Sequence, residues 1–339
     1  MPLIRTTLVA LMALAFLAHG AAAEPLKIRV AWITVPTSLA PILFAKPELA
    51  RHLGTSYTVE PTRFAGSSQM TTALASGDLD VAELSYSSFA FAVENGHMND
   101  LRVIADEIED GVPGYFSSEY RVLNDGPVKS VDDLKGKVLA TNVIGTGTDI
   151  GMRAMMRKHG LEDKRDYTII EANFANMAAL LFDHKADLIT SIPFFQTEEL
   201  RQKSHPLFEL RDVMGVSQIL SLSARAPFIE KNRAALTDYM EDYLRSLRWY
   251  LNPANHKEAV AIVSNFTKLD PSRFDRWVLT KGDQYRDPDG KPNLAAMQHN
   301  IDEQRALGFL AEPFAVAQYA DLSIVEAADR RLQAEATRN

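Results

Sequence analysis

Residues 67–84 read SSQMTTALASGDLDVAEL, and residues 174–191 read FANMAALLFDHKADLITS. The second stretch begins 107 positions after the first, and the two align without a gap. Each has apolar residues at helical spacing, then a short polar break, then an apolar run with the length of a buried strand. The matched positions are Met70 with Met177, Leu74 with Leu181, Asp80 with Asp187, and Val81 with Leu188. The pattern predicts the same helix and strand twice.

Other helices and strands surround both copies. The strands that we predict are Leu26–Trp32, Tyr57–Val59 and Asp80–Leu84 around the first copy, and Lys137–Thr141, Tyr167–Ile170 and Asp187–Thr190 around the second. The helices are Leu39–Leu53, Gln69–Ser76 and one from Phe89, then Ile150–His159 and Met177–Asp183. This alternation predicts an α/β fold of two lobes, each with a mostly parallel sheet flanked by helices. Chance similarity between two such units is the alternative explanation of the match, so we infer only a shared architecture and do not argue for gene duplication.

Two extended segments, Tyr115–Leu123 and Val216–Ala226, stand where the chain must leave the first lobe and return to it. They divide the chain into lobe 1 (residues 24–115), lobe 2 (residues 116–215), and a return crossover with C-terminal helices that pack mainly on lobe 1 (residues 216–339). The C-terminal helices that we predict are Asn232–Leu251, His256–Asn265, Ser272–Leu279, Leu294–Leu307 and Val316–Ala334.

The first 23 residues have the pattern of a cleavable export signal. Arg5 precedes the apolar run Leu8–Leu17, which is too short to span a bilayer, and Ala21–Ala23 supplies small residues for cleavage before Glu24. An uncleaved membrane anchor is the alternative. No Cys follows the apolar run, which excludes a lipid-anchored lipoprotein. We therefore expect a periplasmic protein, residues 24–339.

Composition and motifs exclude several classes of function. The formal net charge is −8 without a basic run, which argues against nucleic-acid binding, and there is no Cys for disulfides or thiolate chemistry. The histidines lie far apart in sequence, so we expect no metal site, and no nucleophile motif or other catalytic residue is evident. Residues 145–151 (GTGTDIG) nearly match a dinucleotide fingerprint, but the third Gly is one position late. We expect no cofactor.

A ligand site is predicted where loops follow the strands. In parallel α/β sheets, ligands bind beyond the carboxyl ends of the strands, and helix N-termini there attract anions. The corresponding loops are Val35–Ala40, Ser85–Ser88, Gly145–Asp149 and Ser191–Phe194, and three of them are rich in hydroxyls. The candidate ligand-binding residues are Thr37, Ser38, Ser85, Tyr86, Ser87, Thr146, Thr148, Asn173 and Phe194.

Alternatives remain for these residues. The hydroxyls can simply cap helices, and Phe194 can belong to an ordinary core. We expect the hydroxyls of Ser85 and Thr146 to be exposed at loop tips. If Glu83 and Asp149 lie in a cleft between the two lobes, their carboxylates would repel an anion but attract the ammonium group of a zwitterion. Asp149 can equally complement the dipole of the helix that follows it.

Two motifs in this order resemble those of a known family. Residues 73–82 (ALASGDLDVA) resemble the AL-x-x-G-x-x-D-x-A stretch of the periplasmic solute-binding proteins of ABC importers, and residues 130–137 (SVDDLKGK) resemble their S-x-x-D-L-K-G-K. Asp187 to Pro193 is similar to their second D-A…P stretch, and the nitrate, sulfonate, taurine and thiamine-precursor type is the most similar. The chain departs from the family at Gly145–Thr148, where Gly-Ser is common, and at Ser85–Ser87, where a Gly is often seen.

The resemblance implies a type II bilobal fold, ligand capture between the lobes, and delivery to a permease in the inner membrane. We therefore expect a monomeric binding protein, not an enzyme, for a small organic anion or zwitterion such as a sulfonate or an aromatic carboxylate. An exported enzyme on the same bilobal frame and a ligand sensor for a membrane receptor are the alternatives.

Overall fold

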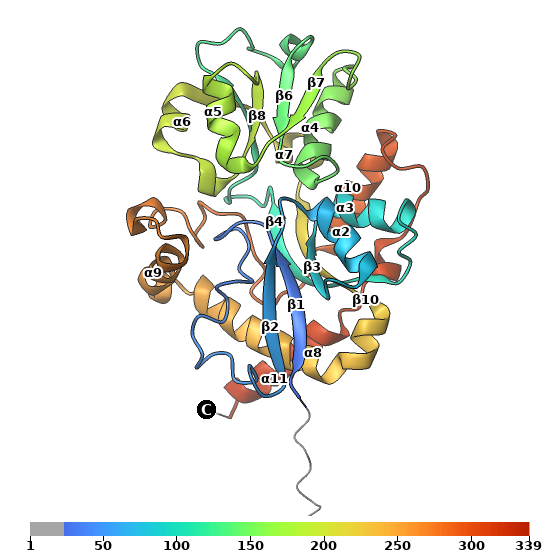
Figure 1. Cartoon of the computed structure of the whole chain (residues 1–339), viewed down its shortest axis with the longest axis vertical. Coiled ribbons are helices and arrows are strands. Elements are labelled where there is room, and N and C mark those ends of the chain that lie inside the picture. Colours follow the sequence, from blue (N-terminus) through green and yellow to red (C-terminus); the bar gives the residue numbers. More distant parts are fainter. Residues whose placement is uncertain (1–23, 339) are drawn as a thin grey trace, which may run out of the picture.

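The computed structural model describes residues 24–338. The predicted export signal and its cleavage site lie outside these residues. The protein has two five-stranded sheets, which lie one beyond the other along the long axis of the molecule (Figure 1). No helix among residues 24–338 combines the length and the apolar character needed to cross a membrane.

The first sheet has the strand order β2-β1-β3-β10-β4. Its strands are β1 (Leu26–Trp32), β2 (Tyr57–Arg63), β3 (Val81–Leu84), β4 (Leu101–Asp110) and β10 (Ser217–Arg225). Strand β1 pairs in parallel with β2 and β3, whereas β10 runs antiparallel between β3 and β4.

The second sheet repeats this plan in the order β7-β6-β8-β5-β9. Its strands are β5 (Glu119–Leu123), β6 (Val138–Thr141), β7 (Thr168–Glu171), β8 (Leu188–Ser191) and β9 (Ser204–Glu209). Strand β6 pairs in parallel with β7 and β8, and β5 runs antiparallel between β8 and β9. The predicted α/β fold with two sheets of one architecture is confirmed.

Helices cover both sheets. The first lobe has α2 (Ser67–Ser76) and α3 (Tyr86–Glu94), and the second has α4 (Gly147–Lys158), α5 (Met177–Phe182), α6 (Glu198–Lys203) and α7 (Leu210–Met214). The C-terminal helices are α8 (Ala226–Leu251), α9 (His256–Thr267), α10 (Leu294–Ala306) and α11 (Ser323–Ala336). Single turns of 3₁₀ helix are η1 (Val131–Leu134), η2 (Phe174–Asn176), η3 (Pro193–Phe195), η4 (Pro253–Asn255), η5 (Pro271–Arg273) and η6 (Val316–Tyr319).

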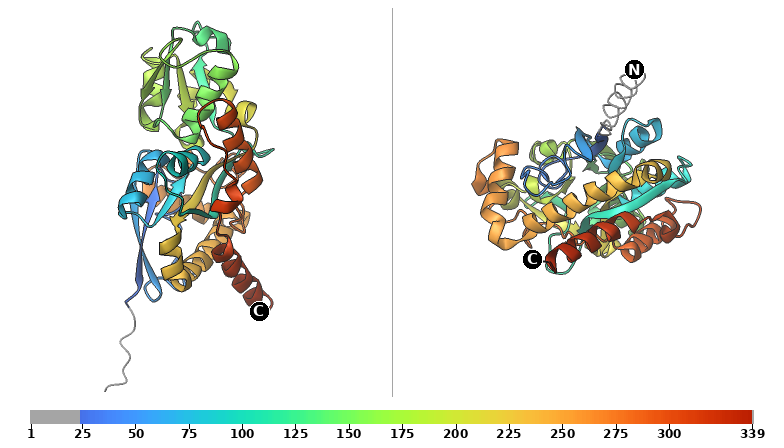
Figure 2. Two further views of the ribbon diagram at one scale, coloured as in Figure 1. Left: turned by 90° about the vertical axis from the view of Figure 1, so that its right-hand side faces the viewer. Right: turned by 90° about the horizontal axis from the view of Figure 1, so that it is seen from below.

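The chain after β10 lies mainly beside the first sheet. Helix α11 packs on α8 at the end of the molecule far from the second sheet (Figure 2). Both extended segments predicted as crossings are strands, but β5 lies inside the second sheet and β10 inside the first. The boundaries at residues 115 and 215 stay predictions.

Two predicted helices do not form, and a third is divided into two elements. Residues 39–53 form successive turns, because Pro41 and Pro47 have no N–H for a helical hydrogen bond. Residues 272–279 have only the short turn η5, followed by turns that end at Leu279 with φ of 56°. The helix predicted from Val316 to Ala334 is two elements, η6 and α11, because Ala320 leaves the helix to bridge to β4.

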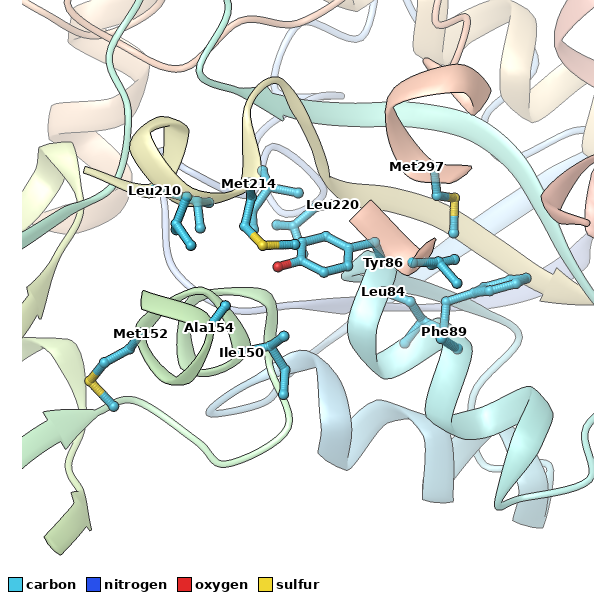
Figure 3. Packing of buried hydrophobic residues seen from close by; sticks show 14 of the residues in the cluster. Leu84, Tyr86, Phe89, Ile150, Met152, Ala154, Leu210, Met214, Leu220 and Met297 are labelled. Atoms are coloured by element: carbon cyan, nitrogen blue, oxygen red, sulfur yellow. The ribbon is translucent and has the colours of Figure 1, made fainter. Parts of the chain in front are cut away.

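One apolar cluster joins the two lobes. It includes Tyr86 and Phe89 from α3, Ile150 from α4, Met214 from α7 and Leu220 from β10. Figure 3 shows the Tyr86 ring between α4 and the segment that carries Met214 and Leu220. The lobes therefore share a packed contact on this side of the molecule.

Candidate functional site

The loops that follow strands of both sheets meet around a small cavity of about 60 Å³, here called the chamber. Residues directly after β1, β3, β6 and β8 line it, so the carboxyl ends of parallel strands from both lobes point toward one volume. Its polar lining includes Thr37, Ser85, Asn142, Thr146, Thr148 and Gln284. Among the described residues no Lys, Arg, Asp or Glu lines the chamber. The site therefore offers hydroxyl and amide groups without a formal charge.

The second lobe contributes the start of α4. Thr146 Oγ1 donates to Asn142 Oδ1 at 3.1 Å and to the Val143 carbonyl at 2.8 Å, and Thr148 Oγ1 donates to the same Asn142 oxygen at 3.0 Å. Thr146 is the N-cap residue of α4, but its side chain makes no capping hydrogen bond. The N-terminus of α4 thus stands beside the chamber, where its partial positive charge favours an anion.

Asp149 turns away from the chamber. Its carboxylate accepts hydrogen bonds from the Gly145 N–H at 2.9 Å and from Arg153 Nε at 3.0 Å. Burial raises the pKa of Asp149, and the Arg153 guanidinium opposes that rise. Because Arg153 balances its charge, Asp149 leaves the chamber open to an anion.

In the first lobe, Thr37 and Ser38 point in different directions. Thr37 lines the chamber, is 7% exposed, and its Oγ1 has no hydrogen-bond partner within residues 24–338. Ser38 instead donates to Glu83 Oε2 at 2.6 Å and accepts from the Ile33 N–H at 3.0 Å. The buried Arg286 donates to the Thr37 carbonyl at 2.7 Å, which fixes the backbone from which the Thr37 hydroxyl projects.

A buried carboxylate pair lies behind this loop. Burial raises the pKa of Glu83 well above its usual range, and the neighbouring Glu107 raises it further, against the hydrogen bond from Ser38. Glu107 accepts from the Tyr243 hydroxyl at 2.6 Å. Glu83 does not line the chamber, so it does not offer its charge to an ammonium group there.

The loop at the start of α3 faces the second lobe. Ser87 and Ser88 donate to the Gly145 carbonyl at 3.0 and 3.1 Å, and Tyr86 donates to the Gly147 carbonyl at 3.2 Å. Ser85 caps α3, since its side chain accepts from the Ser88 N–H at 3.1 Å. Of the residues in the α3 loop only Ser85 lines the chamber, whereas Tyr86 and Ser87 join the lobes.

The expected exposure of two hydroxyl residues is wrong. Ser85 is 1% exposed and Thr146 is 4% exposed. The reason is that the loops at the starts of α3 and α4 pack against each other across the cleft, which covers both tips. The exposure of these two residues depends on which residues of the opposite lobe cover them. The sequences of the two loops do not specify those residues.

The remaining two candidates lie at the edge of the site. Asn173 precedes the turn η2 and is next to Phe174, which lines the chamber. Phe194 lies outside the chamber, where its ring stacks on Phe274 with centroids 5.9 Å apart and an angle of 6° between the planes.

Sequence reasoning missed five polar residues of the chamber, which are Thr34, Ser67, Ser118, Asn142 and Gln284. Asn142 directly follows a predicted strand, so its position could have marked it. Ser118 and Gln284 are far apart in the chain and are brought together by Asp110, which accepts from the Ser118 N–H at 2.8 Å and from Gln284 Nε2 at 2.6 Å. No local pattern predicts that pairing. Within residues 24–338 no group of His, Asp and Glu side chains is arranged to hold a metal ion.

Three solved structures show the same fold. The alkanesulfonate-binding protein SsuA from Xanthomonas axonopodis pv. citri, bound to MOPS, has a TM-score of 0.68 at 18% identity over 89% of this chain and 100% of that one. The aliphatic sulphonate binding protein SsuA from Escherichia coli has a TM-score of 0.63 at 17% identity over 89% and 100%. The nitrate-binding protein NrtA from Synechocystis PCC 6803 has a TM-score of 0.69 at 16% identity over 91% and 90%.

No curated protein sequence matches the chain. A family model does match, and it covers residues 21–264, which include both sheets and all of the chamber lining except Gln284. Two lobes of one architecture, with a site at the carboxyl ends of their strands, agree with that match. The chain belongs to the NMT1-like family.

Proposed function

We propose that this protein is the periplasmic solute-binding component of an ABC importer, and that it captures a small organic anion or zwitterion with a sulfonate or carboxylate group. The observation that carries the proposal is the chamber, which receives uncharged hydroxyl and amide groups from both lobes. The fold is that of proteins described as sulfonate-binding and nitrate-binding. The protein is exported, and its signal is cleaved after Ala23. The mature protein works as a monomer and delivers its ligand to a permease in the inner membrane.

The size of the chamber favours a compact acid group. A water-sized probe occupies about 10–15 Å³, so a cavity of about 60 Å³ has room for about four to six heavy atoms. Nitrate, a carboxylate with its carbon, and a sulfonate with its carbon all fit that range. The hydroxyl of Thr37 and the N-terminus of α4 supply donors from opposite lobes.

Binding stabilises the closed arrangement of the lobes, because only that arrangement contacts the ligand from both sides. The permease then recognises the closed protein. No bond of the ligand is broken in this proposal, which separates it from an exported enzyme on the same fold. Mass spectrometry of ligand recovered after incubation tests this point, since a binding protein returns the compound unchanged.

Thr37→Val is the sharpest test of the site. Valine keeps the shape of threonine, and the hydroxyl that is lost has no protein partner, so stability should be unchanged or slightly higher. A hydrogen bond to a charged ligand contributes about 1.5–3 kcal/mol, so the affinity for methanesulfonate, nitrate or acetate should fall about tenfold to a hundredfold.

Thr141→Val is the matched control. Thr141 Oγ1 is also buried without a partner, but Thr141 does not line the chamber. Isothermal titration calorimetry should show native affinity for this variant. If none of the three anions binds the native protein, or if both variants bind equally well, the chamber is not the ligand site.

A further inference from the structure

A second cavity lies beside the chamber, with a volume of about 830 Å³. It lies between residues 193–201, at and before α6, and residues 272–282, which follow α9. In Figure 1 these segments are on the same side of the molecule, with α6 above and the chain around α9 below. We call this cavity the arginine crevice, after Arg201, Arg273 and Arg276 in its lining.

The arginine crevice and the chamber share their walls. Three short segments of chain line both cavities: residues 116–118, 192–194 and 282–284. In each segment one residue lines the chamber, and at least one residue within two positions of it lines the crevice. The two cavities are therefore neighbours along three separate stretches of chain. The crevice therefore lies close to a ligand that occupies the chamber.

A row of aromatic rings leads from one cavity to the other. Phe174 lines the chamber and stacks on Phe195 with centroids 5.9 Å apart. Phe195 meets Phe194 edge to face at 4.6 Å, and Phe194 lines the crevice and stacks on Phe274 at 5.9 Å. Rings held against each other in this way form a firm apolar surface for the carbon skeleton of an organic ligand.

The crevice also holds more positive than negative charge, with three arginines against Glu198 and Asp275 in its lining. Arg201 pairs with Glu198 at 3.1 Å, and Asp275 faces His256 at 3.6 Å. Arg273 and Arg276 make no ion pair with any residue in the range 24–338, and both side chains are exposed. In a chain with a net charge of −8, Arg273 and Arg276 give the lining of the crevice a local excess of positive charge.

We propose that the arginine crevice binds the far end of an elongated organic acid that has two acidic groups. This inference rests on the proposed function of the chamber. One acidic group occupies the chamber, the carbon skeleton lies along the aromatic row, and the second acidic group reaches Arg273 and Arg276. A crevice of about 830 Å³ is within the range of about 300–1,000 Å³ typical of sites for organic ligands, whereas the chamber has room only for a head group. Guanidinium groups bind carboxylates and sulfonates through two parallel hydrogen bonds.

The test compares two series of probes by isothermal titration calorimetry. One series contains linear alkanedisulfonates from propane to octane, and the other contains the monosulfonates of the same chains. At the length that spans both cavities, the disulfonate should bind at least about tenfold more tightly than its monosulfonate partner. High salt should reduce this advantage, because the arginines are exposed.

The double variant Arg273→Gln, Arg276→Gln should remove the advantage of the disulfonate. The measured quantity is the ratio of the two affinities within one variant, so a general effect on folding or on the chamber cancels. Arg330→Gln is the matched control, since Arg330 is an exposed arginine on α11 with one weak partner, Glu326 at 3.8 Å, and it should keep the native ratio.

Two results would overturn the inference: no disulfonate of any length binds better than its monosulfonate, or the advantage survives in the double variant. Failure of the proposed function looks different. In that case methanesulfonate, which reaches only the chamber, does not bind the native protein, whatever the two series show. Tight binding of the monosulfonates with no gain for the disulfonates would retain the proposed function and reject the second site.

Discussion

The hydroxyl of Tyr86 donates a hydrogen bond of 3.2 Å to the carbonyl oxygen of Gly147, and so ties the first turn of α3 to the first turn of α4. Ser87 and Ser88 reach Gly145 in the same way. These bonds cross from one lobe to the other at the border of the chamber. Direct protein contacts therefore stabilise the arrangement of the two lobes in this structure.

Tyr86→Phe should weaken ligand binding. The variant keeps the buried ring but loses the hydrogen bond between the lobes, which contributes about 0.5–1.5 kcal/mol to the closed arrangement. Affinity for methanesulfonate should fall about twofold to tenfold, and small-angle scattering without ligand should give a larger radius of gyration. Tyr319→Phe is the control, because that tyrosine packs on Phe89 and Phe314 away from the contact between the loops. Equal effects in the two variants would contradict this role of Tyr86.

Gly147→Ala should obstruct closure. A Cβ atom at this position would lie 2.5 Å from Ile219 Cδ1 and 3.2 Å from the Tyr86 ring. Overpacking of this kind costs about 1–3 kcal/mol, so affinity should fall about fivefold to a hundredfold. Ile219→Val removes the crowded Cδ1 atom, and adding it to Gly147→Ala should restore part of the affinity. If the double variant binds no better than Gly147→Ala, the clash is not the cause.

Glu83 should make stability depend on pH. Burial raises its pKa in the folded state, so the folded protein holds this proton at pH values where the unfolded chain has released it. Stability is then lost as the pH rises from about 4.3, the usual Glu value, through the raised folded pKa. The melting temperature of Glu83→Gln should fall less than that of the native protein between about pH 5 and about pH 8. The exposed Glu326→Gln should leave the native slope unchanged, and a native slope in Glu83→Gln would refute the prediction.

Ser85→Ala and Thr146→Ala, one in each lobe, should affect both stability and binding. Ser85 caps α3, and losing an N-cap costs about 0.5–2 kcal/mol. Thr146 donates to both Asn142 and Val143, so its loss loosens the loop before α4. Chemical denaturation should show a lower free energy of unfolding for each, and calorimetry a weaker affinity for methanesulfonate. Unchanged affinity in both would move the site away from these loops.

The mature protein should begin at Glu24. Cleavage after Ala23 leaves a protein whose intact mass, measured on material from the periplasm, corresponds to residues 24–339. Recovery of protein that retains Met1 in the membrane fraction would favour the alternative of an uncleaved anchor.

Much of the fold could be predicted because local patterns and fold geometry agree. The helix Gln69–Ser76 lies within α2, and the strands predicted at residues 80–84 and 187–190 are β3 and β8 within one residue at each end. Strand β4 was missed, because its buried end carries the carboxylates Asp106, Glu107, Glu109 and Asp110, and such residues seldom occupy a buried strand.

The sequence predicts the site only as far as the order of strands and loops along the chain determines which loops meet. The loops after the parallel strands meet as expected, which brings Thr37, Ser85, Thr146 and Thr148 to one chamber. The directions of Ser38 and Tyr86 depend on the partners Glu83 and Gly147, which other parts of the fold supply. The position of Gln284 depends on Asp110, 174 residues earlier in the chain.

Strand β10 completes the first sheet between β3 and β4, although it follows the whole second sheet in the chain. The second sheet uses one continuous stretch, from Glu119 to Glu209, whereas β3 and β4 lack the strand between them until residue 225 is present. A chain that leaves a membrane N-terminus first can therefore complete its second lobe before its first. The first sheet stays incomplete until β10 is present, whereas all five strands of the second sheet are available once Glu209 is present.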